Sequence, residues 1–117
     1  MKRPAPGDWQ ERDGYSKQEL VPEHLLEDDA MVEVVAVAPD DEVKPHRHDR
    51  TEEVFYILQE GGTLVIDGDA FTPERGEVIV CEPGEEHAVL NDSDQVFRIL
   101  VVKLMYEPDD TVWLDDA

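Results

Sequence analysis

Residues 45–58 have the sequence PHRHDRTEEVFYIL, and this stretch decides the fold prediction. His46 and His48 are separated by one residue, so on a β-strand their side chains point to the same face. Four residues then separate His48 from Glu53, which is room for a tight connection into a second strand. That strand would return alongside the first with Glu53 on its inner face. The stretch therefore predicts two imidazoles and a carboxylate on one side of a strand pair.

Other short strands are predicted on both sides of this pair. The apolar or β-branched runs cover residues 31–38, 54–58, 63–66, 77–81 and 96–106. Gly, Pro and Asp residues bound them, and no long helical period appears. Asp67-Gly68 suits a type I′ hairpin turn, because both central residues of that turn need a positive φ. Short strands punctuated in this way predict an all-β barrel or sandwich.

The longest run, residues 96–106 (VFRILVVKLMY), carries apolar side chains on both faces. A strand with one face in water should alternate apolar and polar residues. We therefore expect one face inside the barrel and the other against a partner subunit, which predicts a homodimer. The alternative is that a second sheet or the N-terminal segment covers that face.

The chain of 117 residues is predicted to form one domain with two flanking segments. Residues 1–30 form an N-terminal extension with a possible edge strand at residues 15–20. The alternative there is a short capped helix, which Pro22 would end. Residues 31–106 form the barrel, and residues 107–117 form an acidic C-terminal tail.

Charge is the most unusual bulk property of the chain. Thirty acidic and ten basic residues give a formal net charge of -20. Such a field repels phosphate backbones, so nucleic-acid binding is not expected. The acid-rich, lysine-poor composition favours a protein from a salt-accumulating halophile. The alternative is an acidic mesophilic protein that repulsion keeps soluble.

The expected cellular location follows from features that the sequence lacks. The N-terminus has no apolar stretch typical of a signal peptide, and no run approaches the roughly eighteen apolar residues of a membrane span. Cys81 is the single cysteine, so no internal disulfide can form. We expect a cytoplasmic protein without membrane contact.

A second motif lies downstream, where residues 82–87 (EPGEEH) place His87 after a Pro-Gly turn. Together the two motifs resemble those of the cupin superfamily, G-x5-H-x-H-x3,4-E-x6-G and G-x5-P-x-G-x2-H-x3-N. The residues that match the first are His46, His48 and Glu53, and those that match the second are Gly76, Gly84, His87 and Asn91.

Three positions depart from these motifs. Acidic residues around Asp40 stand where the first glycine is expected, and Glu82 stands where proline is usual. The glycine after Glu53 comes one residue late, at Gly61, which predicts a β-bulge. None of these changes removes a candidate ligand.

The resemblance implies a double-stranded β-helix, the jelly-roll barrel of the cupins, with one divalent transition-metal ion. In that family the ligands are the two histidines and the glutamate of the first motif and the histidine of the second. Here they correspond to His46, His48, Glu53 and His87. Imidazoles with one carboxylate suit Fe, Mn, Ni, Co, Cu or Zn. The spacing also permits Glu52 as the ligand, but Glu53 matches the family pattern more closely.

The resemblance favours a metalloenzyme acting on a small molecule, with dioxygenase-like or isomerase-like chemistry. One alternative is a barrel that binds or senses a small ligand without turnover, and another is a barrel with a vestigial site and a structural role. Similarity of fold does not select the reaction. No catalytic acid or base beyond the ligands is predicted.

Overall fold

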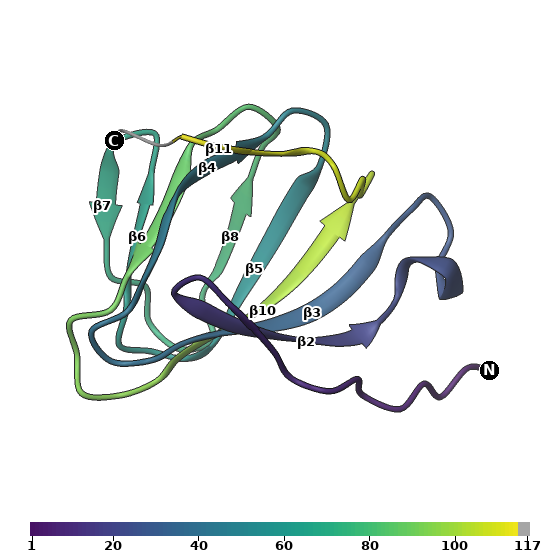
Figure 1. The fold of residues 1–117 in the computed structure, drawn as a ribbon, viewed down its shortest axis with the longest axis horizontal. Helices are drawn as coiled ribbons and strands as arrows, with labels where there is room; N and C mark the ends of the chain where they lie inside the picture. Colours follow the sequence, from purple (N-terminus) through teal and green to yellow (C-terminus); the bar gives the residue numbers. More distant parts are fainter. Residues whose placement is uncertain (115–117) are drawn as a thin grey trace.

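Two antiparallel β-sheets face one another in the computed structural model, which describes residues 1–114 (Figure 1). The predicted all-β fold is confirmed. The six-stranded sheet has the order β1 (Gln10–Arg12), β2 (Tyr15–Val21), β3 (Met31–Val37), β10 (Phe97–Leu104), β5 (Glu52–Gln59) and β8 (Val78–Cys81). The five-stranded sheet has the order β11 (Thr111–Trp113), β4 (Glu42–His48), β9 (His87–Leu90), β6 (Thr63–Ile66) and β7 (Asp69–Phe71). A turn of 3-10 helix, η1 (Glu23–Leu25), precedes β3. Within residues 1–114, no helix has the length and apolar character needed to cross a membrane.

Inward-facing side chains of both sheets form the core, because successive residues of a strand point to opposite faces. In β5, Phe55 and Ile57 are buried while Tyr56 between them is exposed. The same cluster contains Phe97 of β10 and Leu64 of β6, so it joins the two sheets. Each such side chain contributes about 1.5–3 kcal/mol when it is fully buried.

Two local features agree with the sequence prediction. Asp67 and Gly68 have φ values of 48° and 87°, the positive angles of a type I′ turn between β6 and β7. The register of β5 against β10 shifts between Arg98 and Ile99. This irregularity is the bulge predicted from the late position of Gly61.

Both flanking segments take part in the sheets. The N-terminal extension, residues 1–30, includes β2 where we predict a strand, and β1 lies outside it at the sheet edge. The segment predicted as an acidic tail, residues 107–117, includes β11, which pairs with β4. Residues 115–117 of that segment lie outside the described residues. A three-residue strand is too short to show a period-two pattern, so the sequence alone does not reveal it.

Candidate metal centre

Three histidines converge between the sheets because of the position of β4. This strand carries His46 and His48 on one face, and it runs between β9 and β11. His46 is the cross-strand partner of His87 in β9, and their ring centroids are 4.0 Å apart. The ring of His48 lies 5.4 Å from each of the other two rings. All three side chains are buried, and their candidate ligand nitrogens lie within 4.8 Å of one another.

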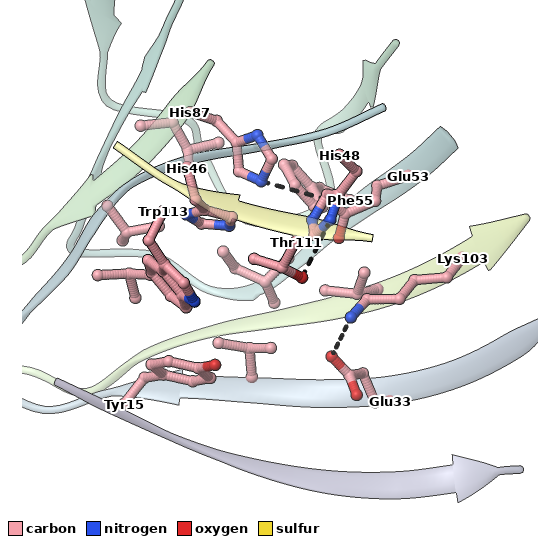
Figure 2. Close-up of a pocket in the computed structure, with 16 residues that line it drawn as sticks. Tyr15, Glu33, His46, His48, Glu53, Phe55, His87, Lys103, Thr111 and Trp113 are labelled. Carbon is pink, nitrogen blue, oxygen red and sulfur yellow. Dashed lines mark hydrogen bonds and ion pairs between the residues drawn. The ribbon is translucent and has the colours of Figure 1, made fainter. Parts of the chain in front are cut away.

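The carboxylate of Glu53 reaches this cluster from the opposite sheet. Its Oε1 lies 2.9 Å from His48 Nε2 and 3.2 Å from His87 Nε2 (Figure 2). Glu53 is 4% exposed, whereas Glu52 is half-buried on the other face of β5. The structure therefore places Glu53, rather than Glu52, against the imidazoles.

Each imidazole has its Nδ1 engaged by a neighbour, which leaves Nε2 for the centre of the cluster. His46 Nδ1 lies 2.8 Å from the carbonyl oxygen of Lys44. His48 Nδ1 lies 3.3 Å from the hydroxyl of Thr111, and His87 Nδ1 lies 3.3 Å from a backbone carbonyl oxygen. Contacts of this kind fix the tautomer and the ring orientation of metal-binding histidines.

Two buried atoms at the centre have no hydrogen-bond partner among residues 1–114, namely Glu53 Oε1 and His87 Nε2. They lie 3.2 Å apart but not in hydrogen-bonding geometry. An unsatisfied buried polar atom costs roughly 1–3 kcal/mol, and a divalent cation contacting both atoms would satisfy them. Three imidazoles and one carboxylate are a donor set that fits a transition-metal ion.

Burial and neighbouring charges shift the protonation of these groups. Burial raises the pKa of Glu53, but the adjacent imidazoles of His48 and His87 outweigh burial and hold that pKa below its usual range. Burial, followed by the charge of His87, lowers the pKa of His46 to about 4. Burial also lowers the pKa of His87, but Cys81 and Glu53 outweigh it and raise this pKa to about 10. At neutral pH the cluster thus presents an ionised Glu53 and a neutral His46, whereas His87 must release a proton to bind a metal ion.

A carboxylate from the C-terminal segment holds the turn between the two ligand-bearing strands. Asp110 accepts hydrogen bonds from the backbone N–H groups of Asp49, Arg50 and Thr51, at 3.1, 2.8 and 2.9 Å. These three residues connect β4 to β5. Arg50 also forms an ion pair with Glu107. Sequence reasoning missed Asp110, because nothing in the sequence distinguishes it from the acidic residues around it.

A largely apolar cavity adjoins the histidine cluster. Its empty volume, with the part open to solvent included, is about 570 Å³. Trp113 of β11 lies against His46, with ring centroids 4.7 Å apart. Tyr15, Glu33 and Lys103 line the side of the cavity that faces the imidazoles (Figure 2). Sequence reasoning predicted none of these four lining residues as part of a site.

The remaining histidine and the motif asparagine lie outside the cluster. Asn91 is buried, and its Nδ2 donates hydrogen bonds to the carbonyl oxygens of Val37 and Gln95. It therefore ties together backbone segments at one end of the barrel. His24 is exposed in η1.

Comparison with known proteins identifies one family and one curated relative. A family model described as a Cupin domain matches residues 33–103. An uncharacterised protein of Methanocaldococcus jannaschii is 31% identical over 55 residues. That alignment covers 47% of this chain and 44% of the relative, so the chain spans less than half of the relative's length.

Several solved structures share the fold. The polyketide cyclase RemF from Streptomyces resistomycificus has a TM-score of 0.77 at 24% identity, over 89% of this chain and 73% of RemF. Streptomyces PAC13, solved with uridine, has a TM-score of 0.77 at 12% identity, over 93% and 85% of the two chains. A predicted oxalate decarboxylase from Thermotoga maritima has a TM-score of 0.73 at 22% identity, over 79% and 81%. At these identities the likeness shows the fold alone, and it confirms the predicted jelly-roll barrel.

Proposed function

Because this chain belongs to the cupin family, we propose that it binds one divalent transition-metal ion through His46, His48, Glu53 and His87. The observation that carries this proposal is the cluster of three buried imidazoles, two of which lie within 3.2 Å of the Glu53 carboxylate, with each Nδ1 engaged by another group. Such a donor set suits Fe, Mn, Ni, Co, Cu or Zn.

We further propose that the site serves an enzyme acting on a small molecule. When bound, the ion supplies a Lewis-acid centre for a ligand oxygen. The chain itself holds the ligand beside the centre, in a cavity whose wall is mostly apolar. Structures of the same fold include a polyketide cyclase and a predicted oxalate decarboxylase, which supports chemistry on small molecules. The finer proposal is a dioxygenase-like or isomerase-like reaction, and the alternative is ligand binding without turnover.

Metal analysis of matched variants tests the site. We expect the wild-type protein, purified in high salt, to hold one equivalent of metal by mass spectrometry. Glu53→Gln should lose the metal, whereas Glu52→Gln, on the other face of the same strand, should retain it. His48→Ala should likewise lose it, and His24→Ala in the exposed η1 should not. Absence of metal uptake by the wild-type protein, or equal metal contents in Glu53→Gln and Glu52→Gln, contradicts the proposal.

Turnover assays separate the enzyme from the binding protein. The metal-loaded protein is incubated with catechols, diketones and sugar phosphates, and oxygen consumption and products are measured. Turnover that disappears in Glu53→Gln supports an enzyme. Metal-dependent binding of a compound that is never converted supports the alternative.

We also propose that two copies associate through the outer face of the six-stranded sheet. On that face Tyr56, Val78 and Val80 are 41%, 57% and 52% exposed. Cross-strand partners form two rows that contain no carboxylate, Val34–Leu100–Tyr56–Val78 and Val32–Val102–Val54–Val80. A chain with a net charge of -20 repels its own copy, so association needs a contact surface free of acidic side chains. The exposed members of these rows, Tyr56, Val78 and Val80, form such a surface.

A further inference from the structure

A line of alternating charges crosses the six-stranded sheet from the candidate metal centre outward. Its members are Glu53 of β5, Lys103 of β10, Glu33 of β3 and Lys17 of β2. Lys103 is the cross-strand partner of Glu53, and its Nζ lies 3.2 Å from Glu33 Oε2. Glu33 Oε1 lies 4.0 Å from Lys17 Nζ. Lys103 therefore stands between a candidate ligand carboxylate and a second buried carboxylate.

The pair formed by Lys103 and Glu33 is buried more deeply than stability alone would favour. The side chains of Lys103 and Glu33 are 13% and 3% exposed. Taking such ions out of water costs several kcal/mol per ion before their attraction is counted, and apolar residues at the same positions are often equally stable. Both residues line the cavity beside the histidine cluster, which points to a role toward a ligand.

Lys103 places a buried positive charge at one end of the cavity. Its ammonium contacts Glu33, which also lies 4.0 Å from Lys17, and Glu53 is the cross-strand partner of Lys103. Burial lowers the pKa of Lys103, but the carboxylates of Glu33 and Glu53 outweigh it and raise this pKa, so the ammonium stays charged. Within residues 1–114, Glu33 alone offers Lys103 Nζ a carboxylate oxygen within 4.0 Å. An ammonium has three N–H donors, so donors remain for a ligand.

Tyr15 adds a neutral donor on the same side of the cavity. It is half-buried at the start of β2, and Figure 2 shows it with Glu33 and Lys103 across the cavity from the imidazoles. Burial raises the pKa of the Tyr15 hydroxyl, so the proton stays on the oxygen and can be donated.

We propose that Lys103 and Tyr15 form a second subsite, which binds a carboxylate at one end of a ligand whose other end is held at the metal centre. Glu33 holds the Lys103 ammonium in position. Val35, Ile99 and Val101 also line the cavity and suit a short hydrocarbon body between the two polar ends. The ligand class is therefore a small carboxylic acid with a metal-coordinating oxygen group at its far end. This inference rests on the metal-binding function proposed above.

Two matched probes test this subsite on the zinc-loaded protein. Succinic monohydroxamate and its neutral amide share the same chelating hydroxamate and differ in the charge at the far end. Calorimetric titration should show that the acid binds about tenfold more tightly than the amide, which is the effect of one charge-assisted hydrogen bond. Equal affinities of the two probes for the wild-type protein would overturn the subsite.

Variants then assign the preference for the acid to particular residues. Lys103→Met alone would leave the buried Glu33 with only the more distant Lys17, at 4.0 Å, so the double variant Lys103→Met/Glu33→Gln removes the closer ion pair as a unit. Its preference for the acid should vanish while its zinc content stays unchanged. Lys44→Met is the control, because the Lys44 side chain is 61% exposed, and it should keep the full preference. A folded double variant that still prefers the acid contradicts the role of Lys103.

Tyr15→Phe is the second variant, because it keeps the ion pair and removes one donor. It should lower the preference for the acid a few-fold, and an unchanged preference contradicts the subsite even where the double variant fails to fold.

Hydroxamate binding separates this inference from the proposed function. If both probes bind equally and zinc is retained, the subsite alone is wrong. If no zinc is retained and neither probe binds, the metal site is wrong and the subsite with it.

Discussion

The backbone N–H of Thr51 donates a hydrogen bond of 2.9 Å to Oδ2 of Asp110, 59 positions away in the chain. The same carboxylate accepts hydrogen bonds from two further backbone N–H groups of this turn. The turn lies between His48 and Glu53. The distance between His48 and Glu53, two candidate ligands on different sheets, therefore depends on Asp110, which lies outside both sequence motifs. The C-terminal segment supports the candidate metal centre.

Asp110→Ala should destabilise the fold and weaken metal binding together. Three backbone donors would lose a charged acceptor, which we expect to cost roughly 2–4 kcal/mol in urea denaturation. Zinc affinity should fall roughly 10- to 100-fold, as it does when a contact that orients ligands is removed. Asp109→Ala, at the exposed neighbouring residue, is the control. Equal behaviour of the two variants would contradict the supporting role of Asp110.

The contribution of Asp110 should also depend on pH. Burial raises its pKa, but the hydrogen bonds from the backbone N–H groups of Arg50, Thr51 and Asp49 outweigh burial and hold the pKa below the ordinary value of 3.8. A carboxyl group with a depressed folded-state pKa stabilises the fold above its unfolded pKa, and this stabilisation is lost as pH falls through the folded-state value. The difference in unfolding free energy between the wild type and Asp110→Asn should therefore be full at about pH 7 and shrink below about pH 4. A difference that stays constant over this range argues against the assignment.

Gly62→Ala should destabilise the core, because no room exists for a methyl group. A Cβ at this position would lie 2.3 Å from Cδ2 of Phe97, whose side chain is fully buried. Moving the ring within a packed core should cost roughly 1–3 kcal/mol, which thermal denaturation measures. Gly7→Ala is the control, since the nearest atom to its Cβ would lie at 3.5 Å. Equal melting temperatures for the two variants would count against this packing.

The net charge of -20 predicts that stability rises with salt. Raising KCl from about 0.1 M to about 1 M shortens the Debye length from roughly 10 Å to roughly 3 Å and so screens the repulsion among carboxylates. The free energy of unfolding in urea should therefore increase over this range. A free energy that does not change with KCl contradicts the prediction of a halophilic protein.

The proposed dimer predicts that a carboxylate introduced on the outer face of the six-stranded sheet separates the two copies. The wild-type protein should sediment as a dimer in high salt. Val80→Glu, which places a carboxylate in an apolar row, should sediment as a monomer. Leu90→Glu, at an exposed residue of the other sheet, should remain a dimer. A monomeric wild-type protein in analytical ultracentrifugation is the result that excludes this interface.

Much of the candidate site was predictable because its determinants are local. The spacing of His46 and His48 places both side chains on one face of any strand. Alternation along β5 places Glu53 on the same face as Phe55, and the Asp67-Gly68 turn follows from the two positive φ angles. Each of these rules spans only a few residues, so no knowledge of distant contacts was needed.

The remaining contacts depend on pairings between strands that are distant in the chain. Trp113 reaches His46 only because β11 pairs with β4. Lys103 lies between the carboxylates of Glu33 and Glu53 only because β10 is inserted between β3 and β5. Such pairings arise from burial of apolar surface over the whole domain, and a short window of residues does not encode them.

The sequence by itself determined most of the strands, because alternation and turn residues are local features, and its resemblance to the cupin motifs implied the candidate ligand set. Only the tertiary structure decided which acidic residue holds the turn and which charges share the cavity. The chain has thirty acidic residues, and local sequence does not distinguish Asp110 or Glu33 from the others. Their roles arise when strand pairing buries them next to particular donors.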